Sequence, residues 1–185
     1  MNYSSRRFAS FAIVLSVSAP VAAQERTGVM GELVQDVATV EEKTVGLAWA
    51  LPAETFGWRP GKGVRSIGEV LLHVAGDNYF LPALMGAAAP PATAIDAADN
   101  KSVARFESRT LTRDQIIAEL EKSFAFLKQA MNDTPDSALE SRPKHSVRNI
   151  TTRGLWIATV SHLHEHLGQL IAYARSNNVT PPWSK

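Results

Sequence analysis

Two histidines near the C-terminus have the spacing of a metal-binding pair. His162 and His166 lie four residues apart in a segment with helical periodicity, so both imidazoles fall on one helix face, about one turn apart. Two such rings can reach a single ion at the roughly 2.0–2.1 Å bond lengths of zinc-type metals. The spacing alone is also compatible with two partly buried histidines that form hydrogen bonds with the backbone or water and bind no metal.

A third histidine interrupts an apolar segment earlier in the chain. His73 lies in EVLLHVAGDNYFLPALM, at the flank of the stripe that a helix would turn inward. A single histidine there is more often a satisfied core residue, but one metal site accounts for three inward histidines on two helices together. The chain has no cysteine, which excludes thiolate ligands, disulfides and cysteine nucleophiles. A purely structural role without metal is kept as a further alternative.

Helical phase separates the remaining C-terminal histidine from this pair. At about 100° per residue, His164 falls nearly opposite His162 and His166, so we expect it to be exposed and outside any metal site. On the other helix, Asp77 follows His73 by one turn. Asp77 is a candidate fourth ligand, outer hydrogen-bond acceptor or general base, and a surface carboxylate is the alternative reading.

The elements that must position these residues are helices. Apolar periodicity predicts four of them, at about residues 27–50, 66–85, 112–131 and 151–175. Ser66 with Glu69, and Thr112 with Gln115, are capping boxes at the starts of the second and third helices. The stretch GAAAPPATAIDAADN after the second helix is long enough for a crossover. We therefore predict an all-α fold, a four-helix bundle with a long connection between helices 2 and 3.

The last helix carries a second apolar stripe beside the histidine face. It consists of Trp156, Val160, Leu163, Leu167 and Ile171. Neighbouring helices of the same bundle could bury this stripe, and a homodimer interface is the alternative.

The N-terminus has the composition of a signal peptide. Arg6 and Arg7 precede a short apolar run, and Val21-Ala22-Ala23 supplies small residues for cleavage. We predict a signal peptide at residues 1–23, a single domain at residues 24–185, and an exported protein, periplasmic or secreted. The net charge is only +1. It therefore does not indicate binding to nucleic acid, or to a membrane after removal of the signal peptide.

Two segments resemble the DinB-like (YfiT-like) metalloenzyme family. WRPGKGVRSIGEVLLHVAGDNYF is similar to that family's Trp/Pro/Gly loop, helix start and histidine, and TTRGLWIATVSHLHEHLGQLIAYAR is similar to its closing helix. The resemblance implies a four-helix bundle with His73, His162 and His166 as metal ligands. It also places Gln169 at the family's glutamine position, as an outer hydrogen-bond partner or a packing residue. Leu163 and Glu165 depart from the family, which commonly has Glu and His there.

The same resemblance implies several functions. The family includes metal-dependent hydrolases and thiol-dependent S-transferases, and we favour a hydrolase because low-molecular-weight thiols belong to the cytoplasm. A divalent ion, zinc first with nickel or iron as alternatives, would be held by three histidines with a coordination position open to water or an unknown small-molecule substrate. A non-catalytic metal-binding or stress-related interaction protein is the alternative of another class.

Overall fold

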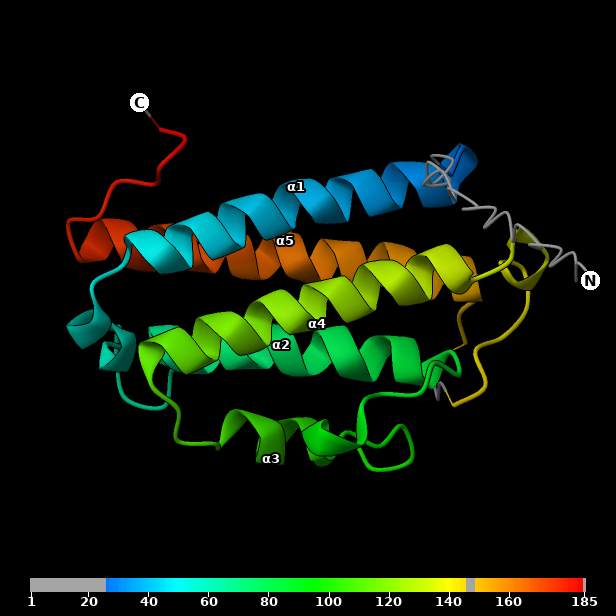
Figure 1. The fold of residues 1–185 in the computed structure, drawn as a ribbon, viewed down its shortest axis with the longest axis horizontal. Coiled ribbons are helices and arrows are strands. Elements are labelled where there is room, and N and C mark those ends of the chain that lie inside the picture. Colours follow the sequence, from blue (N-terminus) through cyan, green and yellow to red (C-terminus); the bar gives the residue numbers. More distant parts are fainter. Residues whose placement is uncertain (1–25, 146–148, 185) are drawn as a thin grey trace, which may run out of the picture.

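Four long helices lie side by side in the computed structural model (Figure 1), which describes residues 26–145 and 149–184. They are α1 (Gly28–Ala50), α2 (Ile67–Leu84), α4 (Arg113–Asp133) and α5 (Thr152–Ser176). The shorter helices are η1 (Ala53–Gly57), η2 (Pro91–Thr93), α3 (Ser102–Glu107) and η3 (Asp136–Ala138). The described residues contain no strand, and the predicted all-α class is confirmed.

The long helices form a closed ring of neighbours around one core. α1 contacts α4 and α5, and α2 contacts the same two helices. The core between them contains large apolar side chains that are at most 1% exposed, among them Val37, Leu47, Leu71, Ile117, Leu120, Phe124, Leu127, Trp156 and Leu170. Close packing of this kind gives α2 and α5 fixed positions relative to each other, which is what a site shared by two helices requires.

The predicted capping boxes fix the starts of α2 and α4. The Ser66 amide donates to Glu69 Oε2 at 2.7 Å, and the Glu69 amide donates to Ser66 Oγ at 3.3 Å. Thr112 and Gln115 make the same reciprocal pair before α4, at 2.9 and 3.3 Å. Because the first box sets where α2 begins, it also sets the direction in which His73 points two turns later.

The connection between α2 and α4 contains a short helix that periodicity did not reveal. The six residues of α3 are too few to show a helical repeat, yet Val103 and Phe106 are buried and α3 packs on α2. A Cβ atom at Gly76 would lie 3.1 Å from Val103 Cγ1 and 3.2 Å from Phe106 Cδ1. Glycine at this position therefore lets α3 lie close to α2, and the end of α3 reaches His73.

The bundle itself covers the second apolar stripe of α5. Trp156, Val160, Leu163 and Leu167 are at most 6% exposed, and Ile171 packs against the same core. Burial within one chain thus accounts for the stripe, and the homodimer stays a prediction.

The predicted signal peptide, residues 1–23, lies outside the described residues. Among the helices that are described, none combines the length and the apolar character needed to cross a membrane.

Candidate metal centre

Three histidines from two helices meet at one place between α2 and α5. His73 belongs to α2, and His162 and His166 belong to α5. The Nε2 atom of His162 lies 3.2 Å from Nε2 of His73 and 3.0 Å from Nε2 of His166. One ligand atom from each of the three residues lies within 4.8 Å of the other two. The structure therefore brings together all three histidines that the sequence predicted.

The nitrogen spacing is compatible with one shared ion. In a tetrahedral site with bonds of roughly 2.0–2.1 Å, two ligand atoms lie about 3.3–3.4 Å apart, close to the 3.0 and 3.2 Å between the Nε2 atoms. The rings meet edge to face, with centroids 4.4, 4.7 and 5.1 Å apart. This arrangement allows each ring to turn a nitrogen, rather than its π face, toward the common centre.

Hydrogen bonds on the far side of two rings assign their protons. His73 Nδ1 lies 2.6 Å from Glu107 Oε1, and His166 Nδ1 lies 2.8 Å from Gln169 Oε1. Both oxygens are acceptors, so each Nδ1 is the donor and carries the ring proton. Gln169 also donates through Nε2 to the Tyr173 hydroxyl at 2.8 Å. The Nε2 atoms of His73 and His166 are consequently left with lone pairs that face the centre of the cluster.

The third ring explains why a cation fits this centre. His162 Nδ1 is buried and has no hydrogen-bond partner among the residues that the structure describes, while its Nε2 faces the lone pairs of both His73 and His166. Asp77 Oδ2 also lies 3.1 Å from His162 Nε2, and one proton on this nitrogen can point fully at only one of the three acceptors. A divalent cation can bind all three nitrogens at once, so the donor set fits a metal ion with nitrogen ligands.

Burial keeps one of the candidate ligands unprotonated. Desolvation, together with weaker effects of the charges on His162, His73 and Arg65, lowers the pKa of His166 to about 4, although the hydrogen bond with Gln169 acts in the opposite direction. An imidazole must be neutral at the ligating nitrogen to bind a metal. His166 is therefore in its ligating form at neutral pH.

Asp77 turns its carboxylate toward the same nitrogens. Its Oδ2 atom lies 3.1 Å from His162 Nε2 and 3.4 Å from His73 Nε2, and the side chain is 16% exposed. The position beside the cluster excludes the reading of Asp77 as an isolated surface carboxylate. From these distances the carboxylate can reach either an ion at the centre or a molecule bound to that ion.

Comparison of the sequence with known protein families identifies the family of this chain. The model of the DinB superfamily matches residues 36–170. This chain belongs to the DinB superfamily. The matched range contains the three histidines, Asp77 and Gln169, and the resemblance drawn from the two motif segments is confirmed. A comparison with curated proteins gives no match for this DinB chain.

Glu107 is the residue of this DinB site that sequence reasoning missed. It accepts the hydrogen bond from His73, and Arg65 approaches it with Nε 3.0 Å from Oε2 and an Nη atom 3.3 Å from Oε1. Burial raises the pKa of Glu107, but the hydrogen bonds and charges of His73 and Arg65 outweigh it and leave the pKa below its usual value. No motif marked Glu107, which lies 34 residues from His73 in a segment without visible periodicity.

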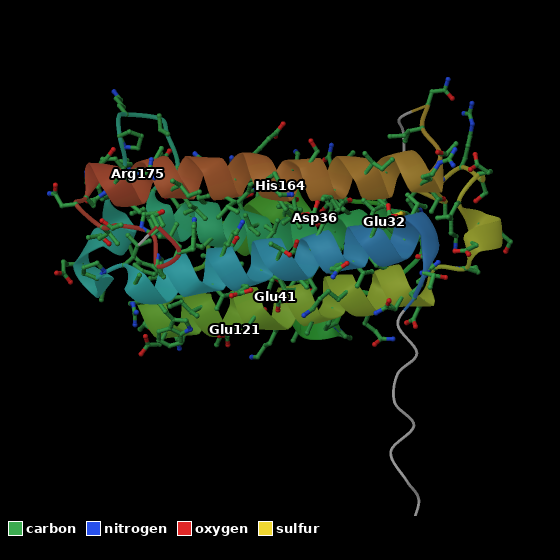
Figure 2. The ribbon with its side chains drawn as sticks, turned by 90° about the horizontal axis from the view of Figure 1, so that it is seen from above. Glu32, Asp36, Glu41, Glu121, His164 and Arg175 are labelled. Carbon is green, nitrogen blue, oxygen red and sulfur yellow. The ribbon has the colours of Figure 1, made fainter. Side chains whose placement is uncertain are left out.

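The three residues between His162 and His166 do not belong to the histidine cluster. Leu163, at a position where DinB proteins commonly have Glu, is 2% exposed and belongs to the core, and Glu165 is exposed. The His164 side chain is 50% exposed and its Nε2 lies 3.1 Å from both carboxylate oxygens of Asp36. Figure 2 shows His164 and Asp36 together on the outer surface of α5 and α1. The prediction that His164 lies outside the site is confirmed.

Proposed function

We propose that this DinB protein is a metal-dependent enzyme of hydrolytic type in which His73, His162 and His166 hold one divalent ion. The observation that carries the proposal is the convergence of three imidazole Nε2 atoms, two of them with lone pairs fixed toward the centre by Glu107 and Gln169. Histidines that served only packing would have no reason to direct unshared lone pairs at one another.

The proposed ion is zinc, with nickel or iron as alternatives, because imidazole suits all three. When bound, such an ion supplies Lewis-acid chemistry, which lowers the pKa of water toward 7 and polarises a substrate oxygen. Three protein ligands leave a coordination position for a small molecule. The side chains of His73 and His162 are 13% and 22% exposed, so the cluster is not fully sealed from solvent.

Asp77 is the residue that we propose as proton acceptor. Its carboxylate is held beside His162 and His73, where it can accept a hydrogen bond from a nucleophile on the open side of the cluster and take its proton. The same carboxylate could instead serve as a fourth ligand. Replacement by asparagine separates the two roles, because loss of a base leaves zinc affinity nearly unchanged whereas loss of a ligand lowers it.

The first test is the metal content of protein purified without an affinity tag. Wild type should contain about one zinc, nickel or iron per chain by elemental mass spectrometry, and His162→Ala should contain almost none. Metal-loaded wild type should then hydrolyse members of a panel of ester, amide and phosphoester substrates, and Asp77→Asn should be slower by about 10²–10⁴-fold. Wild type without metal after incubation with zinc would refute the site.

A metal-binding or stress-related interaction protein without turnover is the alternative to a hydrolase. Metal content with no turnover on the substrate panel would support this function, and turnover only with added low-molecular-weight thiols would support an S-transferase.

A further inference from the structure

Arg65, Glu107 and His73 form a continuous chain of hydrogen bonds that ends at the histidine cluster. Glu107 is the last residue of α3, and its Oε1 atom accepts from His73 Nδ1 at 2.6 Å. Arg65, immediately before the N-cap of α2, donates to both oxygens of the same carboxylate at 3.0 and 3.3 Å. The Glu107 side chain is 15% exposed and the Arg65 side chain is 43% exposed, so the His73 end of the chain is shielded from solvent and the Arg65 end is not.

We propose that Glu107 is a positioning residue for metal binding, which holds His73 in the tautomer and orientation that a divalent cation needs, and that Arg65 holds Glu107 in place. The inference rests on the proposed metal site and assigns to it a charged outer partner from the connection between α2 and α4.

The chemistry of the bond supports this role. A carboxylate that accepts the Nδ1 proton leaves the lone pair of the ring on Nε2, fixes the ring plane and makes Nε2 a stronger donor to a metal. The three rings differ in this respect. Gln169, which is neutral, does the same for His166, and His162 Nδ1 has no partner in the described part of the chain. Glu107 is therefore the negatively charged partner in this set of outer hydrogen bonds.

The fold holds Glu107 at this place by specific contacts. α3 lies against α2 because Gly76 leaves room for Val103 and Phe106. Arg65 adds two donors, one to each oxygen, so both an imidazole and a guanidinium hold the carboxylate. Bonds with this geometry restrict the carboxylate more than a single surface ion pair does.

A purely structural role of Glu107 makes a different prediction. If the carboxylate only fastens α3 to the bundle, its removal lowers stability and leaves the metal site of the folded protein unchanged. If it positions His73, its removal weakens metal binding and changes the ligand field even where the protein remains folded. Metal affinity and the absorption spectrum of bound cobalt therefore separate the two roles.

The experiment uses full-length mature protein and Zn²⁺ or Co²⁺ alone as probe. Zinc affinity is measured by competition with a chromophoric chelator for wild type, Glu107→Ala, Glu107→Met, Glu107→Gln and Arg65→Ala, and the visible spectrum of the Co²⁺ form is recorded for each. Glu119→Gln is the matched control, since Glu119 is a similarly shielded carboxylate (18% exposed) that bonds Tyr79 and Arg109 instead of a histidine.

Glu107→Ala should raise the zinc dissociation constant by about 10- to 100-fold and shift the Co²⁺ bands, with smaller effects for Arg65→Ala. Glu107→Met has nearly the same size, cannot accept the hydrogen bond and decides the case if the alanine variant does not fold. Glu107→Gln keeps an acceptor oxygen without the charge, as Gln169 does for His166, and should retain part of the affinity. Wild-type affinity and spectrum in folded Glu107→Met and Glu107→Ala would overturn the positioning role while leaving the metal site intact. No zinc binding by wild type would overturn the proposed function first.

Discussion

The three candidate ligands differ in how far the protein orients them before an ion arrives. His73 and His166 are each held by a hydrogen bond at Nδ1, whereas His162 Nδ1 has no partner in the described residues. Two of the three rings thus have a fixed tautomer, and only the third must adjust on binding. Such preorganisation reduces the ordering cost of binding and favours a tight site.

The first prediction compares two neighbouring histidines of α5. His166→Ala should weaken zinc binding by more than the about 10- to 100-fold typical of losing an outer hydrogen-bond partner, because it removes a ligand. His164→Ala should leave zinc binding unchanged, because His164 faces Asp36 on the outer surface. Isothermal titration of metal-free protein with zinc measures both. Loss of binding in the His164 variant with retention in the His166 variant would show that the assigned ligands are wrong.

The sequence predicted those residues of the site that share a helix face with another site residue. The step of four from His162 to His166, and from His73 to Asp77, places each pair on one helix face. Glu107 could not be found in this way, since its contact with His73 joins α2 to α3 across 34 residues. Such a contact depends on tertiary packing, and no local pattern in a single sequence encodes it.

Among the elements, α3 links packing to the chemistry of the site. Periodicity and capping residues were enough to predict the four long helices, because each buries one face over many turns. α3 has only six residues and owes its place to Val103 and Phe106, which pack over Gly76. A helix this short is stabilised by tertiary contacts rather than by its own propensity, so no local pattern in the sequence predicted it.

The second prediction tests this packing with Gly76→Val. The new side chain would meet Val103 and Phe106 at distances where a Cβ atom is already crowded, so α3 must shift. We expect a loss of about 1–3 kcal/mol in the free energy of unfolding and weaker zinc binding, because Glu107 moves with α3. Urea unfolding and zinc titration measure the two effects.

The matched control for this packing test is Gly46→Ala. Gly46 is also a helical glycine, but a Cβ atom there meets nothing within 4 Å. Alanine should therefore raise stability slightly, by up to about 1 kcal/mol, with no effect on zinc. Unchanged zinc affinity in a folded Gly76→Val protein would show that α3 and the metal site are independent.

At the scale of the whole molecule, the start of the described chain is tied to the far end of α4. The Arg26 guanidinium donates to the Thr134 carbonyl and to Asp136 Oδ1, both at 2.6 Å. Cleavage after Ala23 would keep these bonds in the mature protein. The third prediction is therefore that exported protein begins at Gln24, as measured by intact mass. A mature chain that retains residues 1–23 would refute the signal peptide, and with it the proposed periplasmic or secreted location.

The exposed apolar surface of the described residues bears on the assembly of the protein. Among the described residues, the large apolar side chains that remain exposed are distributed over α1, the loop after η1, α5 and the C-terminal tail, at Val29, Trp49, Val64, Ile157 and Trp183. Scattered exposure of this kind is normal on the surface of a monomer. Sedimentation equilibrium tests the predicted homodimer directly.

The fourth prediction concerns the response of the metal-free protein to acid. The pKa of His166 is about 4 in the folded state, against about 6.5 in an unfolded chain. Between these values the unfolded state binds the extra proton, so folding stability falls as the pH decreases from about 6.5 toward 4. Partial exposure of the site screens the effect, and we expect a loss of about 1 kcal/mol between pH 7 and pH 5.

This acid sensitivity is measured by urea unfolding at both pH values after treatment with a chelator. His166→Gln, which cannot take up the proton, should be less sensitive to pH in this window than wild type. His145→Gln, in a loop away from the cluster, should behave like wild type.

Glu107 affects stability at lower pH. The stability that its lowered pKa contributes is lost only as the pH falls below the usual carboxyl range. Bound zinc should abolish the wild-type loss down to the pH at which protons displace the metal, since a coordinated imidazole is not protonated. Equal acid sensitivity of wild type and His166→Gln would mean that the histidine cluster is not desolvated as the fold implies.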